Sequence, residues 1–430
     1  MKIVVFSQFW APENGVPQRR WVWLSRVLND LGHEVNAIAP FPHYRMNKTL
    51  ADSFNSFKKI GLAETGGAGE VVFRSPFLIL GDSLSARVIA QAVNAVGAIA
   101  TVAVRQKEVR ESDVVLGTVP AIPTAFISFL VAKIFRKSLV IDLRDAWPDL
   151  LDVREKWNES TGKRSLRERI FSQGPAQLLS FIVKHALFYV LDHADGIVVT
   201  SEELAQSLEL RGLKSGARCR RIFTIPNVFP SAPGVEDIVR QASEHEELRV
   251  LYAGTLGRAQ NLQNAIQAVE LANSRGANVR LRFVGAGAAQ PDLVSSAAGK
   301  DSVEFLESRS LSELKEQYLW ADTALVHLAG WGPLKMAVPS KTFELISLSL
   351  HISGVVEGEA ARLISDLEVG TVVKPDDPDA LAEMWIEMFN DRSRLGVGTK
   401  GIRWLEEQRN VKVPMKLSKL MAALEKKGEE

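Results

Sequence analysis

Residues 248–257, with the sequence LRVLYAGTLG, decide the fold of the second half of the chain. The apolar run at their start predicts a buried strand, and the glycine-containing turn after it leads into a helical pattern over residues 261–275. Residues 279–288, VRLRFVGAGA, repeat the same order of strand and glycine turn. Strands and helices then alternate as far as TVVKP at residues 371–375, which is typical of a doubly wound α/β domain.

The first half of the chain shows the same alternation. KIVVFSQ at residues 2–8 predicts a first strand, residues 17–31 predict a helix that ends at Gly32, and HEVNAIAP at residues 33–40 predicts a second strand. Continuous runs of Val, Ile and Leu in the later strands indicate burial on both faces of a parallel sheet. The sequence therefore predicts an α/β protein with two Rossmann-like domains. Ligands of such sheets bind at the carboxyl ends of the strands.

A segment rich in Pro and turn-forming residues, IPNVFPSAPGVED at residues 225–237, separates the two patterns. We therefore predict four parts: an N-terminal domain (1–228), a linker (229–247), a C-terminal domain (248–405) and a helical tail (406–430). We expect the tail to pack back on the N-terminal domain.

The composition limits the class of protein. With 430 residues the chain is too long for one ordinary core, which agrees with two domains. Its 52 Lys and Arg residues are balanced by 51 Asp and Glu residues, so we expect no nucleic-acid partner. The only cysteine is Cys219, which excludes an internal disulfide and suits a reducing cytoplasm.

The apolar segments do not predict a membrane span. A signal peptide is not expected either, because MKIVVFSQFW has one Lys and only a short apolar run. The longest apolar stretches, residues 88–104, 119–132 and 178–191, are shorter than the roughly 20 clean apolar residues of a spanning helix or are interrupted by polar ones. We therefore expect a cytoplasmic protein.

Several segments carry a family resemblance, and they occur in the family's order along nearly the whole chain. They are residues 6–35 (FSQFWAPENGVPQRRWVWLSRVLNDLGHEV), 142–149 (DLRDAWPD), 251–262 (LYAGTLGRAQNL) and 338–345 (VPSKTFEL). Together they resemble the retaining nucleotide-sugar glycosyltransferases of family 4. DLRDAWPD is similar to a segment of the subgroup that builds bacterial surface polysaccharides. The resemblance implies the GT-B fold, in which two Rossmann-like domains face a cleft between an acceptor-binding and a donor-binding domain.

The segment around Pro339 predicts an anion site. Proline suits the first turn of a helix, so the N–H groups of Ser340, Lys341 and Thr342 should point out of the helix start. These groups and the helix dipole attract an anion. The resemblance implies that this anion is the donor diphosphate, that Lys341 adds a charge, and that Glu344 accepts hydrogen bonds from the ribose. An ordinary surface helix is the simpler alternative.

Other donor-side candidates follow strands. Arg258 could stabilise the charge that develops on the leaving β-phosphate, or it could be a solvated loop residue. We expect Gly285 to lie in a loop that lines the nucleotide pocket. Ser308 and Ser310 fall where the family contacts the base. Gly15 would let backbone approach the transferred sugar and phosphates, and a plain turn is the alternative.

The acceptor side is expected near the N-terminal domain. Arg144 and Asp145 end a predicted strand, and they either bind the acceptor, position the sugar, or form a pair that holds a loop. Asp145 joins Arg258 and Lys341 as a catalytic candidate. His43 and Tyr44 are candidates for the acceptor side, and a loop histidine without a role is equally plausible.

The chain departs from the family pattern at some positions. Met336 stands where the family usually has a second Glu, eight residues before Glu344, and Ser349 and His351 stand where Gly and Pro are common. These changes keep a catalytically weakened nucleotide-sugar-binding protein open as an alternative. A nucleotide-sugar epimerase is a second alternative, although no convincing pair of acid and base side chains supports it.

The resemblance implies a retaining transferase of the hexosyltransferase type, with a UDP-sugar as the expected donor. It implies no cofactor and no metal, because no Asp-x-Asp occurs where metal-dependent transferases hold a cation. The implied acceptor is a glycan or a polyprenyl-diphosphate-linked sugar of bacterial surface polysaccharide synthesis. Residues 162–191 have a basic start and an apolar helical continuation, which predicts peripheral contact with the inner face of the membrane or, alternatively, a core helix.

Overall fold

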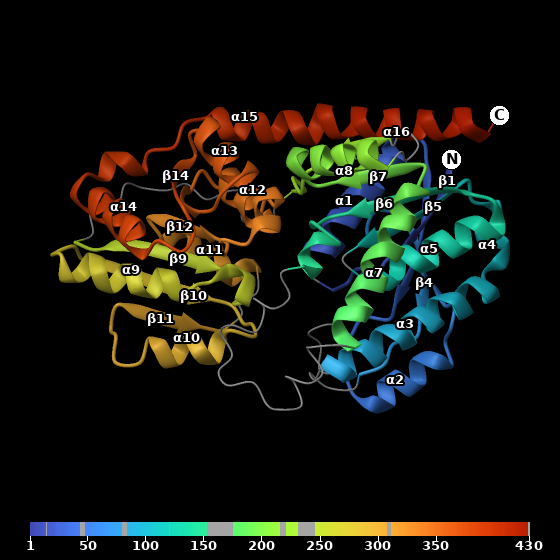
Figure 1. Cartoon of the computed structure of the whole chain (residues 1–430), viewed down its shortest axis with the longest axis horizontal. Coiled ribbons are helices and arrows are strands. Elements are labelled where there is room, and N and C mark those ends of the chain that lie inside the picture. The colour runs from blue at the N-terminus through green and yellow to red at the C-terminus, as the bar shows by residue number, and fades with distance from the viewer. Residues whose placement is uncertain are drawn as a thin grey trace. The chain divides into compact units, whose positions relative to one another are not determined.

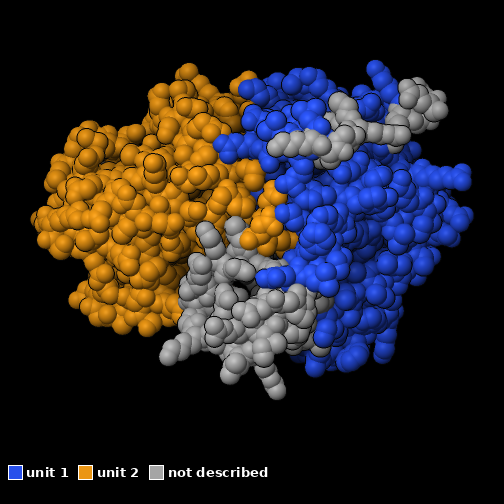
Figure 2. Space-filling view, viewed as in Figure 1, with its two compact units in different colours: residues 1–148, 177–229, 410–430 blue, residues 149–176, 230–409 orange. Residues whose placement is uncertain are grey.

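The computed structural model of the chain (Figure 1) describes residues 1–13, 15–43, 48–79, 84–119, 121–152, 175–215, 221–230, 246–307 and 311–428. Figure 2 shows its two compact units. Unit 1 comprises residues 1–148, 177–229 and 410–430, and unit 2 comprises residues 149–176 and 230–409. This division differs from the predicted boundaries mainly in residues 149–176, which it groups with unit 2. The predicted linker lies almost wholly outside the described residues.

Unit 1 is built on a sheet with the strand order β3-β4-β2-β1-β5-β6-β7-β8. Its strands are β1 (Lys2–Phe6), β2 (Glu34–Pro40), β3 (Ala63–Thr65), β4 (Val71–Ser75), β5 (Val114–Val119), β6 (Ser138–Leu143), β7 (Gly196–Val199) and β8 (Ile222–Thr224). All pair in parallel except β3, which is antiparallel to β4. The short β3 has no apolar run, and sequence patterning therefore missed it.

The helices of unit 1 are α1 (Val16–Asp30), α2 (Leu50–Phe57), α3 (Leu84–Val104), α4 (Gln106–Glu111), α5 (Ile122–Phe135), α7 (Pro175–Asp192), α8 (Glu202–Ser215) and α16 (Val413–Gly428). Local chemistry explains their starts. Thr49 and Asp52 form a capping box at α2, in which each side chain bonds the other residue's backbone N–H. Proline lies in the first turn of α1 and of α5, where its missing N–H costs no hydrogen bond.

The C-terminal helix α16 belongs to unit 1 although it follows unit 2 in sequence. Leu417, Leu420 and Leu424 are buried along one side of it. Lys416 Nζ donates a hydrogen bond of 2.8 Å to the Thr224 carbonyl of β8. Apolar burial at this helical spacing, together with the bond to β8, holds the last helix on the unit that begins the chain.

Unit 2 is built on a parallel sheet with the strand order β11-β10-β9-β12-β13-β14. Its strands are β9 (Leu248–Ala253), β10 (Val279–Val284), β11 (Val303–Leu306), β12 (Thr323–His327), β13 (His351–Val355) and β14 (Gly370–Val373). Its helices are α9 (Gln263–Ser274), α10 (Gln290–Ser296), α11 (Leu311–Trp320), α12 (Ser340–Ser347), α13 (Glu359–Asp366), α14 (Pro378–Asn390) and α15 (Lys400–Glu407). Short 3₁₀ turns occupy Asp149–Leu151, Arg258–Gln260, Gly332–Met336 and Arg392–Leu395, and a π-helical turn spans Gln408–Lys412.

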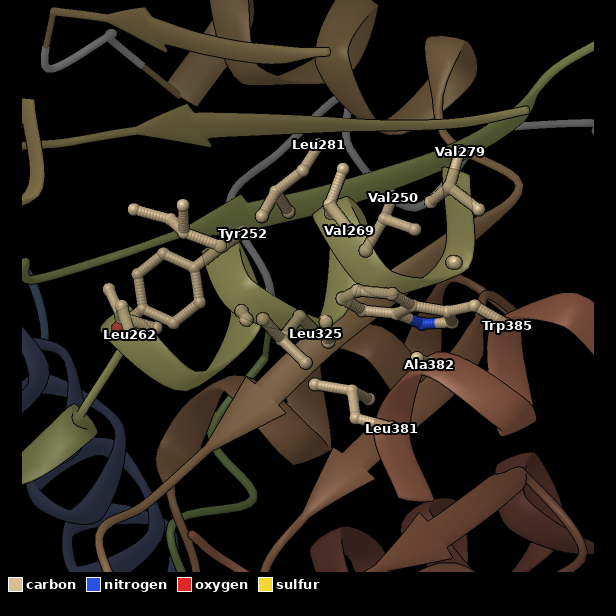
Figure 3. Close-up of a cluster of buried hydrophobic side chains, with 14 of the residues drawn as sticks. Val250, Tyr252, Leu262, Val269, Val279, Leu281, Leu325, Leu381, Ala382 and Trp385 are labelled. Atoms are coloured by element: carbon tan, nitrogen blue, oxygen red, sulfur yellow. The ribbon is translucent and has the colours of Figure 1, made fainter. Parts of the chain in front are cut away.

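The core of unit 2 lies between its sheet and the helices α9 and α14 (Figure 3). Trp385 of α14 is fully buried in a cluster that includes Val250 of β9 and Val269 of α9. The indole N–H of Trp385 donates to Ser353 Oγ at 3.2 Å, so burial leaves no orphaned donor there. This packing fixes the position of β9. It thereby also fixes where the loop after β9 begins.

Both sheets have a topological switch point, where strand order reverses. In unit 1 it lies between β1 and β5, and in unit 2 between β9 and β12. Open α/β sheets bind ligands just beyond the carboxyl ends of the strands at such points. Both units are thus the doubly wound domains that the sequence predicts. Within the described residues, no helix is long and apolar enough to cross a bilayer.

Candidate functional site

The start of α12 lies beyond the switch point of unit 2. Pro339 is its N-cap, and the helix begins at Ser340. In the described part of the chain, the backbone N–H groups of Ser340 and Lys341 have no hydrogen-bond acceptor. Thr342 differs from the prediction, because its N–H donates to the Pro339 carbonyl at 2.9 Å and its side chain is fully buried. Two N–H groups, and not three, are therefore available for an anion.

Lys341 and Glu344 meet a third residue, Tyr318 of α11, that sequence reasoning missed. Tyr318 Oη donates to Glu344 Oε1 at 2.7 Å and accepts from Lys341 Nζ at 2.9 Å. Lys341 Nζ also lies 3.4 Å from Glu344 Oε2, and these two side chains are 26% and 11% exposed. We call these three residues the Lys341 cluster. In the structure, the ammonium that was expected to face the diphosphate is bonded to Tyr318 and paired with Glu344.

The electrostatics of the Lys341 cluster follow from its burial. Burial raises the pKa of Tyr318 to about 12, and Glu344 adds to this effect while Lys341 opposes it. Burial also disfavours the Lys341 ammonium, but Tyr318 and Glu344 outweigh it and hold the pKa of Lys341 above its ordinary value. At neutral pH the Tyr318 phenol therefore keeps its proton and can donate to Glu344, while Lys341 is positively charged.

Arg258 begins a 3₁₀ turn directly after the loop that follows β9. Two contacts fix this turn. Asn261 Nδ2 donates to Asp376 Oδ1 at 2.6 Å, and the Ala259 carbonyl accepts from the Ala329 N–H at 2.8 Å. Since residue 329 follows β12, the contacts join the loops on both sides of the switch point. Arg258 is therefore carried by a rigid turn at the edge where a ligand would bind.

Gly285 has a packing reason that the sequence did not reveal. Its φ is +146°, and an added Cβ would overlap the carbonyl oxygen of Gly254 in the neighbouring loop. The Gly254 N–H donates to the Val284 carbonyl at 2.9 Å, so the loops after β9 and β10 touch backbone to backbone. Glycine at 285 is required by this contact. Its predicted role beside a nucleotide stays a prediction.

His327, at the end of β12, is a buried polar residue of unit 2 that no motif indicated. Its Nε2 lies 3.1 Å from Asn264 Nδ2 of α9. Burial lowers the pKa of His327 to about 4, so the ring is neutral at physiological pH. The neutral imidazole of His327 therefore links β12 to α9 through its contact with Asn264, and it adds no charge to the interior of unit 2.

On unit 1, Gly15 is the N-cap of α1. Its backbone is extended, with φ −141° and ψ 173°, which any residue can adopt. An added Cβ would lie 2.6 Å from Gln18 Oε1. Gln18 Nε2 in turn donates to Glu13 Oε2 at 3.0 Å. Gly15 therefore leaves room for the Gln18 amide, and its approach to a sugar stays a prediction.

His43 follows β2 and is held by Glu13, a buried carboxylate that the sequence did not single out. The His43 N–H donates to Glu13 Oε1 at 2.7 Å. The ring stacks on Phe77 with centroids 4.9 Å apart, and Nδ1 lies 2.9 Å from the Phe41 carbonyl. These contacts orient the ring. The other candidates Tyr44, Ser308 and Ser310 lie outside the described residues.

Arg144 and Asp145 lie just beyond β6. Arg144 Nε donates to the Val119 carbonyl of β5 at 3.1 Å, and its own carbonyl accepts from Thr200 Oγ1 at 2.7 Å. Burial raises the pKa of Asp145, with Asp142 adding and Arg144 opposing, and burial lowers the pKa of Arg144. Asp145 is thus a half-buried acid at the carboxyl edge of the first sheet.

Asp142 and Arg20 form a buried ion pair in the centre of unit 1. Arg20 Nη2 lies 3.0 Å from Asp142 Oδ1, and both side chains are at most 1% exposed. Trp21 Nε1 donates to Asp142 Oδ2 at 3.1 Å, and Arg20 Nη1 donates to the Ile225 carbonyl at 2.9 Å. The pair ties α1 to β6 and to the segment after β8. Arg20 therefore faces the interior of the unit.

Two residues that depart from the family pattern, Ser349 and His351, lie among the described residues of unit 2. Ser349 has φ 47°, the left-handed region that favours glycine. His351 is a buried residue of β13, with Nδ1 2.9 Å from Thr323 Oγ1 and Nε2 3.4 Å from Thr371 Oγ1. Ser349 thus lies in the turn directly after α12, and His351 lies in the buried strand that follows it. Among the described residues, no three His, Cys, Asp or Glu side chains gather in a way that could hold a metal ion.

Comparison with known proteins finds one family match, in the second half of the chain. Residues 247–391 match the family model "Glycosyl transferases group 1". That range contains Arg258, the glycine loops and the whole Lys341 cluster. No curated protein sequence matches the chain.

The fold is similar to that of solved structures. Sucrose-phosphate synthase from Thermosynechococcus elongatus has a TM-score of 0.64 at 13% identity, with 98% of each chain covered. Anabaena HepE, solved in complex with UDP and glucose, has a TM-score of 0.61 at 14% identity, covering 98% of this chain and 100% of that chain. WaaG, a glycosyltransferase involved in lipopolysaccharide biosynthesis, has a TM-score of 0.57 at 15% identity, covering 95% of this chain and 94% of that chain. At these identities the likeness concerns the fold, and it confirms the predicted GT-B architecture. The chain thus has the GT-B fold, and its residues 247–391 are similar to the glycosyl transferases group 1 family.

Proposed function

We propose that the protein is a retaining glycosyltransferase that takes a sugar from a nucleotide diphosphate sugar, with UDP as the expected nucleotide. The acceptor is a glycan or a polyprenyl-diphosphate-linked sugar of bacterial surface polysaccharide synthesis. The observation that carries the proposal is the start of α12. Its two available N–H groups and the Lys341 cluster lie together at the switch point of the domain that matches the family.

Each residue has a role in this proposal. The N–H groups of Ser340 and Lys341 bind the donor diphosphate, and Arg258 stabilises the charge on the departing β-phosphate. Glu344, held by Tyr318 and Lys341, accepts hydrogen bonds from the ribose. The bond between the anomeric carbon and the β-phosphate oxygen breaks, and the acceptor oxygen bonds to that carbon on the same face. The acceptor proton passes to the leaving phosphate. The helix N–H groups, Lys341 and Arg258 stabilise the diphosphate charge in place of a metal ion, so the proposal includes no cofactor and no metal.

Nucleotide binding tests the donor site. We expect one of UDP, GDP, ADP, TDP and CMP, and UDP first, to raise the melting temperature of the protein. A ligand at 100 times its Kd stabilises the folded state by about 2.7 kcal/mol. At about 2–4 °C per kcal/mol for a domain of this size, the shift is several degrees. Glu344→Ala and Arg258→Ala should abolish most of it, while Glu316→Ala, a change at an exposed residue of α11, should leave it intact.

The outcomes separate the alternatives. If none of the five nucleotides changes the melting temperature at millimolar concentration, the donor site is wrong. Binding without transfer to any membrane or glycan extract would favour the nucleotide-sugar-binding protein. Conversion of the donor sugar without an acceptor would favour an epimerase.

We also propose that unit 1 contacts an anionic membrane surface. The helices α3, α5 and α7 lie side by side, since α3 packs on α5 and the Phe129 ring of α5 lies 5.7 Å from Tyr189 of α7 (Figure 1). Their exposed apolar side chains are Ile89, Val96, Ile99, Val104, Leu130, Ile134, Leu178, Phe181, Ile182 and Tyr189. From the first to the last residue of each helix the sequence has a single acidic residue, Asp192, against the cations Arg87, Lys133 and Lys184. An apolar surface with basic residues and almost no acidic ones suits anionic lipid.

A vesicle assay tests this contact. Phe181→Glu combined with Ile182→Glu should lower binding to phosphatidylglycerol-containing vesicles at least about tenfold, because two apolar groups are lost and two repelling charges are added. Leu319→Glu is the matched control, since Leu319 is 48% exposed on α11 of unit 2. Equal binding of the double variant and the wild type, or equal binding to purely zwitterionic vesicles, would contradict the proposal.

A further inference from the structure

Asp376 joins three loops at the carboxyl edge of the unit 2 sheet. It follows β14, and its two carboxylate oxygens accept hydrogen bonds from the other two loops. Asn261 Nδ2, at the end of the turn after β9, donates to Oδ1 at 2.6 Å, and the Gly330 N–H, after β12, donates to Oδ2 at 3.2 Å. Since β13 lies between β12 and β14 in the sheet, the segment after β14 reaches past β13 to make these bonds. We call Asp376, Asn261 and Gly330 the Asp376 clamp.

Two members of the clamp hold their backbone in a conformation that favours glycine. Asn261 has φ 42° and Asp376 has φ 62°. Asn and Asp adopt this left-handed region more readily than other side chains do, but it is still less favourable for them than for glycine. Strained residues of this kind persist where their surroundings fix them, and they cluster at functional sites. Glycine would relieve the strain at either position but lose the bond, so the bond is what these two side chains contribute.

Gly330 leaves room for the Asp376 carboxylate. A Cβ added at residue 330 would lie 2.4 Å from Asp376 Oδ2. The neighbouring Ala329 N–H donates to the carbonyl of Ala259, the residue after Arg258, at 2.8 Å. The loop after β12 therefore contacts both Asp376 and the turn that carries Arg258, and each of the three loops contacts the other two.

The clamp fixes the position of a turn more than it stabilises the fold. Its two side-chain bonds lie at the surface, where water competes for the same donors and acceptors, so they contribute little to the free energy of unfolding. Arg258 begins the 3₁₀ turn that ends at Asn261. Loss of the clamp should therefore move Arg258 without unfolding unit 2.

We propose that Asp376 is a positioning residue for Arg258, which it holds in place through Asn261 and Gly330. The inference rests on the proposed function in one respect, namely that Arg258 acts on the departing β-phosphate. A misplacement of about 1 Å in the active site can lower a rate about 100-fold. Arg258 is still present when the clamp is lost, so the donor binds, but the charge that develops in the transition state is stabilised less well.

A glycine variant separates positioning from stability. Asp376→Gly removes both bonds and relieves the left-handed strain, so its melting temperature should stay close to that of the wild type. We expect kcat to fall at least about tenfold, while KM for the donor changes less than about threefold. Glu368→Gly is the matched control, because Glu368 is an exposed acid of unit 2 with φ 56° that pairs with Lys400 at 2.9 Å. The control should keep the wild-type kcat and KM.

Exchanging the two side chains tests the bond itself. Asn261→Asp alone places two carboxylates against each other, so we expect kcat to fall about tenfold. Asn261→Asp combined with Asp376→Asn lets the amide at position 376 donate to the carboxylate at position 261. The amide oxygen can still accept from the Gly330 N–H. In this double variant kcat should return to within about threefold of the wild type, since the two changes are coupled.

Hydrogen–deuterium exchange follows the turn without any substrate. Within the turn the Asn261 N–H donates to the Arg258 carbonyl at 3.1 Å. The amides of residues 258–262 and 329–331 should exchange at least about threefold faster in Asp376→Gly than in the wild type. They should exchange at the wild-type rate in Glu368→Gly and in the double variant.

Any of four results overturns the proposal. They are unchanged exchange of the turn in Asp376→Gly, a wild-type kcat in that variant, an equal fall of kcat in Glu368→Gly, and no recovery in the double variant. The proposed function is judged separately, on the wild type. If exchange follows the clamp but the wild type neither binds a nucleotide nor transfers a sugar, the proposed function fails and the clamp still holds the turn. If the wild type transfers a sugar and Asp376→Gly does so equally well, the clamp proposal alone fails.

Discussion

Replacing Asp142 with alanine is expected to destabilise unit 1 by about 3–5 kcal/mol, because the change leaves the buried Arg20 guanidinium without its counter-charge. Asp142 accepts from Arg20 at 3.0 Å and from Trp21 Nε1 at 3.1 Å, and Arg20 is fully buried. An arginine side chain stays charged inside a protein. The Arg20 guanidinium must therefore remain as an uncompensated charge or pull α1 away from β6.

Hydrogen–deuterium exchange of peptides from β1 and β6 measures this loss within unit 1, where a whole-chain melting curve would mix both units. Asp142→Asn keeps the shape and two acceptor lone pairs but not the charge, so its effect should be smaller. Glu111→Ala is the control for an exposed ion pair with Lys2, and surface changes of this kind stay within about 0.5 kcal/mol. A loss below about 1 kcal/mol in Asp142→Ala would show that Arg20 finds other partners.

Replacing Lys341 with methionine is expected to lower kcat about 100-fold to 1,000-fold while the protein stays folded. Positioned groups that stabilise developing charge in a transition state have effects of this size. Methionine keeps the length of the side chain and removes the ammonium that bonds Tyr318 at 2.9 Å and faces Glu344 at 3.4 Å. Both the positive charge beside the proposed diphosphate site and the bonds that orient Glu344 are lost.

Steady-state turnover of the donor measures this effect, with melting temperature as the check on folding. Lys335→Met is the matched control, because Lys335 is an exposed residue of the preceding 3₁₀ turn and pairs with Glu357 at 3.1 Å. Tyr318→Phe separates the two roles of Lys341, since it loosens Glu344 and keeps the charge. A rise in KM with little change in kcat is expected for Tyr318→Phe. If Lys341→Met stays within a few-fold of the wild type, Lys341 has no part in catalysis.

The sequence located the candidate site of unit 2 more completely than that of unit 1. In unit 2 the strand, glycine turn and helix follow one another within a few residues, so residues 248–288 and the helix start at Ser340 could be located from consecutive residues alone. In unit 1 the strands were equally clear, but the acceptor-side candidates were harder to choose. Glu13, which holds His43, belongs to no motif that stands out in the sequence.

What the sequence by itself determined is the set of properties that depend on neighbouring residues. Apolar runs between turn-forming residues specify buried parallel strands, and prolines specify helix starts. Two successive patterns of this kind specify two Rossmann-like units whose ligand sites lie at the carboxyl ends of their strands.

Only the tertiary structure decided which distant side chains meet. Arg20 finds Asp142 at a separation of 122 residues, and Tyr318 finds Glu344 at a separation of 26. Gly285 is required by a loop 31 positions earlier in the chain, at Gly254. Such contacts depend on strand order and on how helices pack, which no local pattern encodes. The buried partners of a site therefore become visible only once the chain is folded.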